Sequence, residues 1–203
     1  MLRPKSVRSS RCYIKKHRIP DYLERNFQVN FVDVCWSIDI TAIPTRQGEL
    51  HLCAIEDLCS RMIVGFAFGD SPDWRLALRA VKLAFKRRKP HGGIVIHSDS
   101  APPFSNDEYQ SGIDRLGVTP SLSNGGCYNN APIESFFGTL KKERIHWNYY
   151  LTRQDARKST TDYIEQFYNA VRRHSALGFK SPQEFEIGRV FEAERSERAS
   201  AKW

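Results

Sequence analysis

Alternating apolar and polar residues predict a β-strand at residues 34–43. Its apolar positions are Trp36, Ile38, Ile40 and Ala42, and the polar positions between them are Ser37, Asp39 and Thr41. Asp39 therefore lies in the middle of a strand, where a charge is costly unless it has a function. Two more strands are predicted at 50–58 and 62–69, and the short connections favour an antiparallel meander of three strands.

Helical and strand-like segments alternate through the rest of the chain. Residues 72–89 are predicted to form a helix, and the apolar residues 94–96 predict a buried strand that leads to Asp99. The remaining predicted elements are a short helix at 106–116, a strand at 118–122, a helix that opens near 130, a long helix at 152–175, and a polar terminal helix or frayed tail beyond about 186. This order predicts an α/β fold with a mixed five-stranded sheet, three antiparallel strands followed by two further strands, flanked by helices.

The helix that opens at Asn130 carries several candidate functional groups. Asparagine is a helix-capping residue and Pro132 suits a first turn, so Glu134 lies about one turn inside the helix. Lys141 follows Glu134 by nearly two turns and shares its stripe, with Gly138 between them, where another molecule can approach closely. Taken alone, the stretch is also explained by an amphipathic helix whose first-turn acid favours the helix dipole.

The composition is that of a basic globular domain. The chain has 203 residues, of which 40% are hydrophobic and 12% aromatic, so it can bury one sizeable core. The formal charge of +8 and a pI near 9.4 make nucleic acid the first candidate partner, although charge alone does not separate DNA from RNA. Five cysteines without a CxxC pair argue for a reducing compartment and against a disulfide framework or zinc ribbon. With neither a membrane span nor a signal-peptide core in the sequence, we expect a cytoplasmic protein without a membrane partner.

Three carboxylates fall where this fold would build a site. Asp39 lies on the first strand, Asp99 at the carboxyl end of the fourth, and Glu134 near the start of a helix that follows a loop. In open α/β sheets, sites form outside the carboxyl ends of the strands. The order and placement of the three acids resemble the ribonuclease H-like fold of retroviral integrases and DDE transposases, and the spacing from Asp99 to Glu134 is close to the family pattern.

Local motifs sharpen this resemblance to the integrase-core transposases of bacterial insertion sequences, whose catalytic subunit is made from a second reading frame. The matching segments are Trp36-Ser-Ile-Asp39-Ile-Thr41, Ile55-Glu-Asp57-Leu-Cys-Ser60-Arg61, His97-Ser-Asp99, Asn130-Ala131, Glu134-Ser-Phe-Phe137, Leu140-Lys141, Phe167-Tyr-Asn169, Arg172, His174-Ser175 and Ser181-Pro182. The resemblance covers roughly residues 32–185. Each motif alone is weak, but their common order makes the match specific.

The resemblance implies a DDE-type polynucleotidyl transferase, a transposase or integrase that cleaves DNA and transfers a strand in a metal-dependent reaction. Two Mg²⁺ ions are implied, with Mn²⁺ able to substitute, because two cations stabilise the entering and leaving oxygens. Asp39 would contact both ions, Asp99 one and Glu134 the other. Magnesium is held by few carboxylates together with substrate phosphate oxygens, so three acids suffice.

The resemblance also implies contacts to DNA outside the three acids. Lys141 would contact a substrate phosphate as a point charge, and Lys142, Asn130, Arg172 and His174 are further candidates. For Arg172 and His174, docking of a helix end onto the core is an equally good explanation. The implied partners are element ends and target DNA, on which the chain would act as a homo-oligomer.

Two further titratable residues are better explained by structure. Asp57 shares a short polar connection with Ser60 and Arg61, so we interpret it as a turn-capping residue. We interpret His97 as a satisfied histidine at a strand end, because metal-bound water needs no histidine to lose its proton.

The sequence also departs from the family pattern. Ser100-Ala-Pro-Pro-Phe104 stands where the family usually has a Gly, a Gln and a Tyr. The proline pair is stiffer, so we expect the geometry of the substrate loop to differ from that of the family. Asn129 stands where the family usually has Asp, which removes one charge beside the site.

The expected domain organisation is a basic arm or linker at 1–30, an integrase catalytic core at 31–186 and a polar tail at 187–203. The arm holds eight Lys or Arg against Asp21 and Glu24. We expect the family's N-terminal helix-turn-helix region to be missing, which is consistent with a truncated gene, a remnant, or a product that depends on a helix-turn-helix partner from an upstream reading frame. Two alternatives stay open: an inactive or weakly active DNA-binding fragment that regulates a full-length transposase, and a ribonuclease H-like nuclease.

Overall fold

The computed structural model describes residues 19–123 and 130–200, with side chains as far as Phe191. In these ranges five strands form one sheet in the order β3-β2-β1-β4-β5. The strands are β1 (Cys35–Ile43), β2 (Leu50–Asp57), β3 (Ile63–Gly69), β4 (Ile94–Ser98) and β5 (Val118–Leu122). β1, β2 and β3 pair antiparallel, whereas β4 lies parallel to both β1 and β5. The predicted α/β fold with a mixed five-stranded sheet is therefore confirmed.

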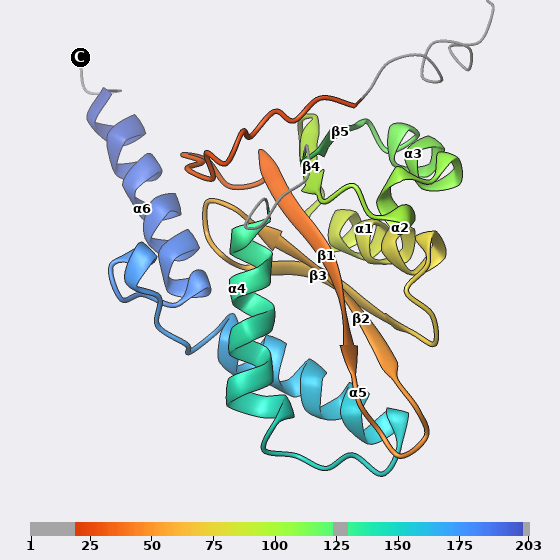
Figure 1. The fold of residues 1–203 in the computed structure, drawn as a ribbon. Helices are drawn as coiled ribbons and strands as arrows, with labels where there is room; N and C mark the ends of the chain where they lie inside the picture. The colour runs from red at the N-terminus through yellow and green to blue at the C-terminus, as the bar shows by residue number, and fades with distance from the viewer. Residues whose placement is uncertain (1–18, 124–129, 201–203) are drawn as a thin grey trace, which may run out of the picture.

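Helices cover both faces of this sheet (Figure 1). The α-helices are α1 (Trp74–Arg88), α2 (Pro102–Ser105), α3 (Asp107–Asp114), α4 (Ala131–Leu140), α5 (Arg153–Asp162) and α6 (Pro182–Ser200). Two π-helical turns, η3 (Lys141–Ile145) and η4 (Tyr163–Tyr168), continue α4 and α5, and a short 3₁₀ turn, η5 (Ser175–Leu177), precedes α6. α1, α2 and α3 lie on one side of the sheet, and α4 and α5 lie on the other (Figure 1).

The alternation along β1 divides the core between these two layers. Trp36 and Ile38 are fully buried and pack with α1 and β4. Ile43 belongs to the cluster formed with α4 and α5. Because successive side chains on a strand point to opposite faces, Ser37 and Asp39 share the α4 side with Ile43. The strand predicted at 34–43 thus has the predicted alternation, and it turns Asp39 towards α4.

Two predicted helices have different boundaries in the structure. The helix predicted at 106–116 is α3, which starts after Asn106, because Asn106 has an extended backbone and its side chain accepts hydrogen bonds from the N–H groups of Glu108 and Tyr109. The short helix α2 lies before it and was not predicted. The helix predicted at 152–175 ends with η4. Asn169 then bonds to both the N–H and the C=O of Ile63, at 2.9 and 3.0 Å, so the helix end is docked on β3.

The C-terminal helix is attached to the core by charged side chains. α6 begins at Pro182, so the polar tail predicted from 187 starts inside a helix. Arg88 pairs with both Asp33 and Glu186, at 2.8 and 2.7 Å, and so joins the end of α1 to α6. Arg189 donates to the carbonyl of Asn30. The last turn of α1 is basic, with Lys86, Arg87 and Arg88 in sequence. Arg88 is used for packing, so it is not available to an anionic partner.

The described part of the N-terminal segment lies beside β5. The Pro20 carbonyl accepts from the Leu122 N–H at 3.1 Å, and the Tyr22 N–H donates to the Ser121 hydroxyl at 3.0 Å. Residues 1–18 of the predicted basic arm lie outside the described residues. None of the described helices is both long and apolar enough to cross a lipid bilayer.

The sheet and α1 approach closely at Gly65. A Cβ added there would lie 2.5 Å from the Ala84 Cβ and 2.8 Å from the backbone of Ala84. We predict that Gly65→Ala lowers the free energy of unfolding by about 1–3 kcal/mol, because the backbone of α1 would have to move. Urea unfolding measures this difference. Gly92→Ala is the control, since a Cβ at Gly92 meets nothing within 4 Å, and equal midpoints for both variants would contradict the close packing.

Candidate functional site

Asp39 and Asp99 lie at matching positions on neighbouring parallel strands. In the β1–β4 pair, Ser37 is opposite His97. Asp39 lies two residues beyond Ser37, and Asp99 lies two residues beyond His97, directly after β4 ends. The pairing register therefore brings the two carboxylates to the same height at the carboxyl end of the parallel pair. Asp99 is further fixed because its carboxylate accepts from the Ala101 N–H at 3.1 Å.

Asn130 fixes the start of α4 against β1. Its amide donates to the Ile38 carbonyl at 2.9 Å and accepts from the Ser37 hydroxyl. Ser37 and Ile38 directly precede Asp39 in the sequence, so the first turn of α4 begins close to it. The N–H of Glu134 bonds to the Asn130 carbonyl at 3.2 Å, which places Glu134 in that turn. The third acid thus reaches the edge of the sheet where Asp39 and Asp99 lie.

The role predicted for the Asn130 side chain needs correction. Asn130 does occupy the N-cap position, but its side chain makes no capping hydrogen bond, because both ends of the amide are bound to β1. The residue is 2% exposed. We therefore assign Asn130 the role of positioning α4. Because its side chain is buried, it is not available to contact a DNA strand at the surface.

The electrostatics of Asp39 link the predicted site residues. Burial and the charges of Asp99 and Glu134 raise the pKa of Asp39, the Ile40 N–H and the Lys141 ammonium lower it, and the net result is a pKa of about 7. Asp39 therefore lies within electrostatic range of both other carboxylates and of Lys141. Glu134 is exposed and Asp39 and Asp99 are half-buried, so the acids face the surface and could meet a ligand.

Lys141 lies where the regular helix changes into a π turn. α4 ends at Leu140, and Lys141 is the first residue of η3. π turns inside helices are frequent at functional sites, because they change the direction of the following side chains. A Cβ added at Gly138, between Glu134 and Lys141 along the helix, would meet nothing within 4 Å. This stripe of α4 is therefore open, as expected for a surface that another molecule approaches.

The other predicted DNA contacts lie in different surroundings. Lys142 is exposed beside Lys141. Arg172 pairs with Glu143, whose carboxylate also accepts from the Tyr163 hydroxyl at 2.6 Å. Arg172 is thus partly neutralised by a helix-docking interaction.

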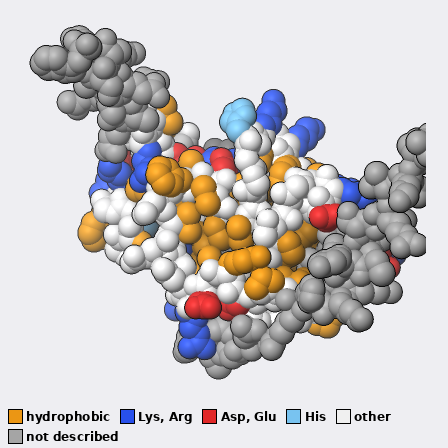
Figure 2. All heavy atoms as spheres, turned by 90° about the horizontal axis from the view of Figure 1, so that it is seen from above, with side chains coloured by type: hydrophobic (Ala, Val, Ile, Leu, Met, Phe, Trp, Pro, Cys, Tyr) orange, Lys and Arg blue, Asp and Glu red, His pale blue; other side chains and the backbone are white. Residues whose placement is uncertain are grey.

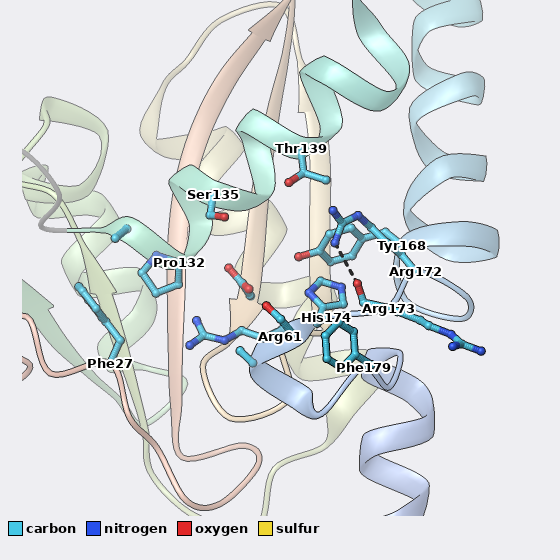
Figure 3. Close-up of a pocket in the computed structure, with 14 residues that line it drawn as sticks. Phe27, Arg61, Pro132, Ser135, Thr139, Tyr168, Arg172, Arg173, His174 and Phe179 are labelled. Carbon is cyan, nitrogen blue, oxygen red and sulfur yellow. Dashed lines mark hydrogen bonds between the residues drawn. The ribbon is translucent and has the colours of Figure 1, made fainter.

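His174 is half-buried, and burial lowers its pKa to about 4, helped by Arg172 and Arg61. The ring is therefore neutral at neutral pH. Arg172 and His174 line a cavity between α4 and the segment that follows η4 (Figure 3).

The structural interpretations of Asp57 and His97 are confirmed. The Asp57 carboxylate accepts from the N–H groups of Asp33, Cys59 and Ser60, at 2.7, 2.9 and 2.9 Å. His97 is 1% exposed, and its Nδ1 lies 3.0 Å from the Ser121 hydroxyl. Sequence reasoning did not single out Glu56, which is 2% exposed and is the buried acid of the cavity beside His174. The signal that could have identified Glu56 was an acid within a predicted, otherwise apolar strand.

The acids offer the hard oxygen ligands that divalent cations such as magnesium prefer. In the described ranges, no three His, Cys, Asp or Glu side chains are arranged to hold one metal ion together. Two ions that share Asp39 would need only two protein carboxylates each, the others being phosphate oxygens and water. The donor set therefore fits the implied pair of ions in kind and number.

Basic side chains are not confined to one patch. Viewed from above, Lys and Arg lie around the rim of the molecule, and hydrophobic side chains fill much of the middle (Figure 2). Several cations are held in ion pairs within the fold, such as Arg87 with Glu165 at 2.6 Å. The net charge of +8 is thus spread over several elements.

Solved structures with similar folds include integrase catalytic cores. The core domain of BIV integrase superposes with a TM-score of 0.57 at 15% identity, covering 82% of this chain and 99% of that one. The catalytic core of HTLV-2 integrase in complex with magnesium has a TM-score of 0.60 at 14% identity, covering 78% of this chain and 99% of that one. At these identities the likeness concerns the fold, and it confirms the predicted ribonuclease H-like architecture.

Sequence comparisons give the family. The transposase for insertion sequence element IS904 of Lactococcus lactis is 34% identical over 168 residues, covering 82% of this chain and 66% of the relative. Transposase InsF for insertion sequence IS3A of Escherichia coli is 35% identical over 176 residues, covering 85% and 61%. The chain thus spans less than two thirds of the length of these relatives. Two family profiles, both described as an integrase core domain, match residues 32–126 and 116–182. The chain therefore belongs to the integrase-core family and is similar to the transposases of insertion sequences.

Proposed function

We propose that this chain is a transposase that cleaves and joins DNA in a metal-dependent reaction at Asp39, Asp99 and Glu134. The observation that carries the proposal is the placement of these acids. The β1–β4 register aligns the first two, Asn130 brings the third, and Asp39 is electrostatically coupled to both others. Relatives at 34% and 35% identity are transposases of insertion sequences, which supports DNA as the substrate.

The three acids have separate roles in the proposal. Asp39, central and half-buried, would hold both Mg²⁺ or Mn²⁺ ions, with Asp99 and Glu134 as the second protein ligand of one ion each. When bound, the pair of cations activates the attacking oxygen and stabilises the charge on the leaving oxygen. The Ala101 N–H orients Asp99, and the backbone of α4 orients Glu134, so the chain fixes these ligands before DNA arrives.

Lys141 and Lys142 are the proposed phosphate contacts of this site. Lys141 lies within electrostatic range of Asp39, and Lys142 is the exposed residue next to it. Ammonium groups in these positions would hold the DNA backbone beside the acids without reading its sequence. Arg172 and His174 would contribute from the neighbouring cavity.

Recognition of the element ends requires another component. A site of three acids and two lysines reads phosphate positions and not base edges. We therefore propose that a helix-turn-helix segment or partner provides sequence recognition, and that the chain acts on DNA as a homo-oligomer.

Replacing any one acid should abolish the reaction. We expect Asp39→Asn, Asp99→Asn and Glu134→Gln each to reduce nicking and strand joining at least about 1,000-fold, because each removes a ligand from a shared centre. Gel assays with labelled element ends, Mg²⁺ or Mn²⁺, and a helix-turn-helix partner measure this loss. Asp107→Asn, an exposed acid in α3, is the matched control. Near wild-type turnover in any of the three variants would disprove the assignment.

The crowding of carboxylates should make the metal-free protein sensitive to pH. The pKa of Asp39 is raised from 3.8 to about 7 in the fold, so its contribution to stability is full below about pH 4 and is lost as pH rises through about 7. In EDTA, Asp39→Asn should therefore stabilise the protein more at pH 8 than at pH 5, by roughly 1–3 kcal/mol. Chemical denaturation at the two pH values measures the difference. An equal effect at both pH values would show that folding does not raise the pKa of Asp39.

Replacing Lys141 should weaken DNA binding without removing a metal ligand. Removing one phosphate contact weakens binding to all sequences, so Lys141→Ala should lower the slope of log affinity against log salt by about one. Titration of labelled duplex at several salt concentrations in EDTA measures this slope. Arg115→Ala, at the end of α3, removes an equal charge elsewhere and should leave it unchanged. An unchanged slope for Lys141→Ala would place Lys141 away from the DNA.

A further inference from the structure

The polar cavity lined by Arg172 and His174 adjoins a different face of α4 from the one that carries Glu134 and Lys141. Its volume is about 620 Å³, within the usual range of ligand pockets. Pro132, Ser135 and Thr139 of α4 form one wall, and the segment 172–179 forms another (Figure 3). Neither wall uses Asp39, Asp99 or Glu134, so the cavity is separate from the three-acid site.

The buried end of this cavity holds polar atoms without partners. Glu56 is 2% exposed, and its Oε2 has no hydrogen-bond partner among the described residues. The Nε2 of His174 is also buried without a described partner. Leaving a buried polar group unsatisfied is destabilising, so both atoms favour a ligand that can hydrogen-bond to them. Burial raises the pKa of Glu56 to about 8, with Arg61 lowering and Asp57 raising it, so the carboxyl can donate as well as accept at neutral pH.

Cations stand on two sides of the opening. The Arg61 side chain reaches towards Pro132 and Phe27, and the Arg173 side chain extends on the opposite side, beyond His174 (Figure 3). Neither guanidinium forms an ion pair with a described residue, whereas Arg172 is paired with Glu143. A ligand with negative charge at both ends would satisfy Arg61 and Arg173 together.

Aromatic rings complete the lining. The rings of His174 and Tyr168 pack edge to face, with centroids 5.0 Å apart, and Phe179 beside them is 68% exposed. A large exposed aromatic ring next to polar groups is a surface on which a flat, polar ring can stack. Nucleobases of every kind stack on protein aromatic rings, because each base has a π-face. The cavity thus combines hydrogen-bonding atoms in its depth, a stacking wall and a cation on either side.

We propose that this cavity binds one unpaired nucleotide of the DNA strand, with the base directed towards Glu56 and His174 and the flanking phosphates at Arg61 and Arg173. The proposal rests on DNA being the substrate of the chain. Successive phosphates carry one charge on each side of a nucleotide, which matches two separated guanidinium groups. A free mononucleotide has the same base and a phosphate on one side only, so it would use one of the two cations.

The test is a titration in EDTA with a duplex that contains one unpaired 2-aminopurine and with the fully paired duplex. The full chain should bind the first duplex about tenfold tighter and quench its fluorescence, since tenfold corresponds to about 1.4 kcal/mol. Arg173→Ala, an exposed residue whose loss does not threaten the fold, and the isosteric Glu56→Gln should each reduce this preference at least about threefold. Arg115→Ala, on the opposite layer, should keep it.

The outcomes separate this proposal from the proposed function. Equal affinity for the two duplexes, or a preference that survives both Arg173→Ala and Glu56→Gln, overturns the nucleotide site while DNA binding itself stands. Binding of deoxyadenosine monophosphate as tight as that of the bulged duplex overturns the assignment to a DNA strand. No binding of either duplex contradicts both proposals.

Discussion

The site depends on holding Asp39 partly buried beside two other carboxylates. Burial and neighbouring negative charge both act against ionisation of Asp39, so the surrounding structure must compensate for them. The compensation comes from the pairing of β1 with β2, in which Asp39 lies opposite Ala54, from the pairing of β1 with β4, which extends as far as Ser37, and from the clusters packed on each face. An arrangement that is costly without cations and favourable with them is what a metal-dependent centre requires.

Asn130 links the position of Asp39 on β1 to the positions of Glu134 and Lys141. A single buried amide bonded to two positions of β1 fixes the first turn of α4, and the helix then determines where Glu134 and Lys141 lie. Another face of the same helix forms a wall of the cavity that contains Glu56. One helix therefore carries both the proposed catalytic surface and the proposed nucleotide site, and both depend on how its start is attached.

Much of the site could be predicted because its residues follow local patterns. The alternation at 34–43 placed Asp39 mid-strand, and the apolar run before Asp99 placed that acid at a strand end. Tertiary contacts decided the rest. The local pattern suggested that the Asn130 side chain caps its own helix, yet its amide binds strand β1. Likewise, the periodicity at 152–175 did not show that Asn169 docks on β3, and nothing local marked the cavity around Glu56.

The most direct measurement is the anomalous scattering of Mn²⁺ in crystals of the chain with a short DNA end. We expect two peaks, one between Asp39 and Asp99 and one between Asp39 and Glu134, with phosphate or water oxygens as the remaining ligands. Manganese bound elsewhere, with these carboxylates free of metal at saturating concentration, would contradict it.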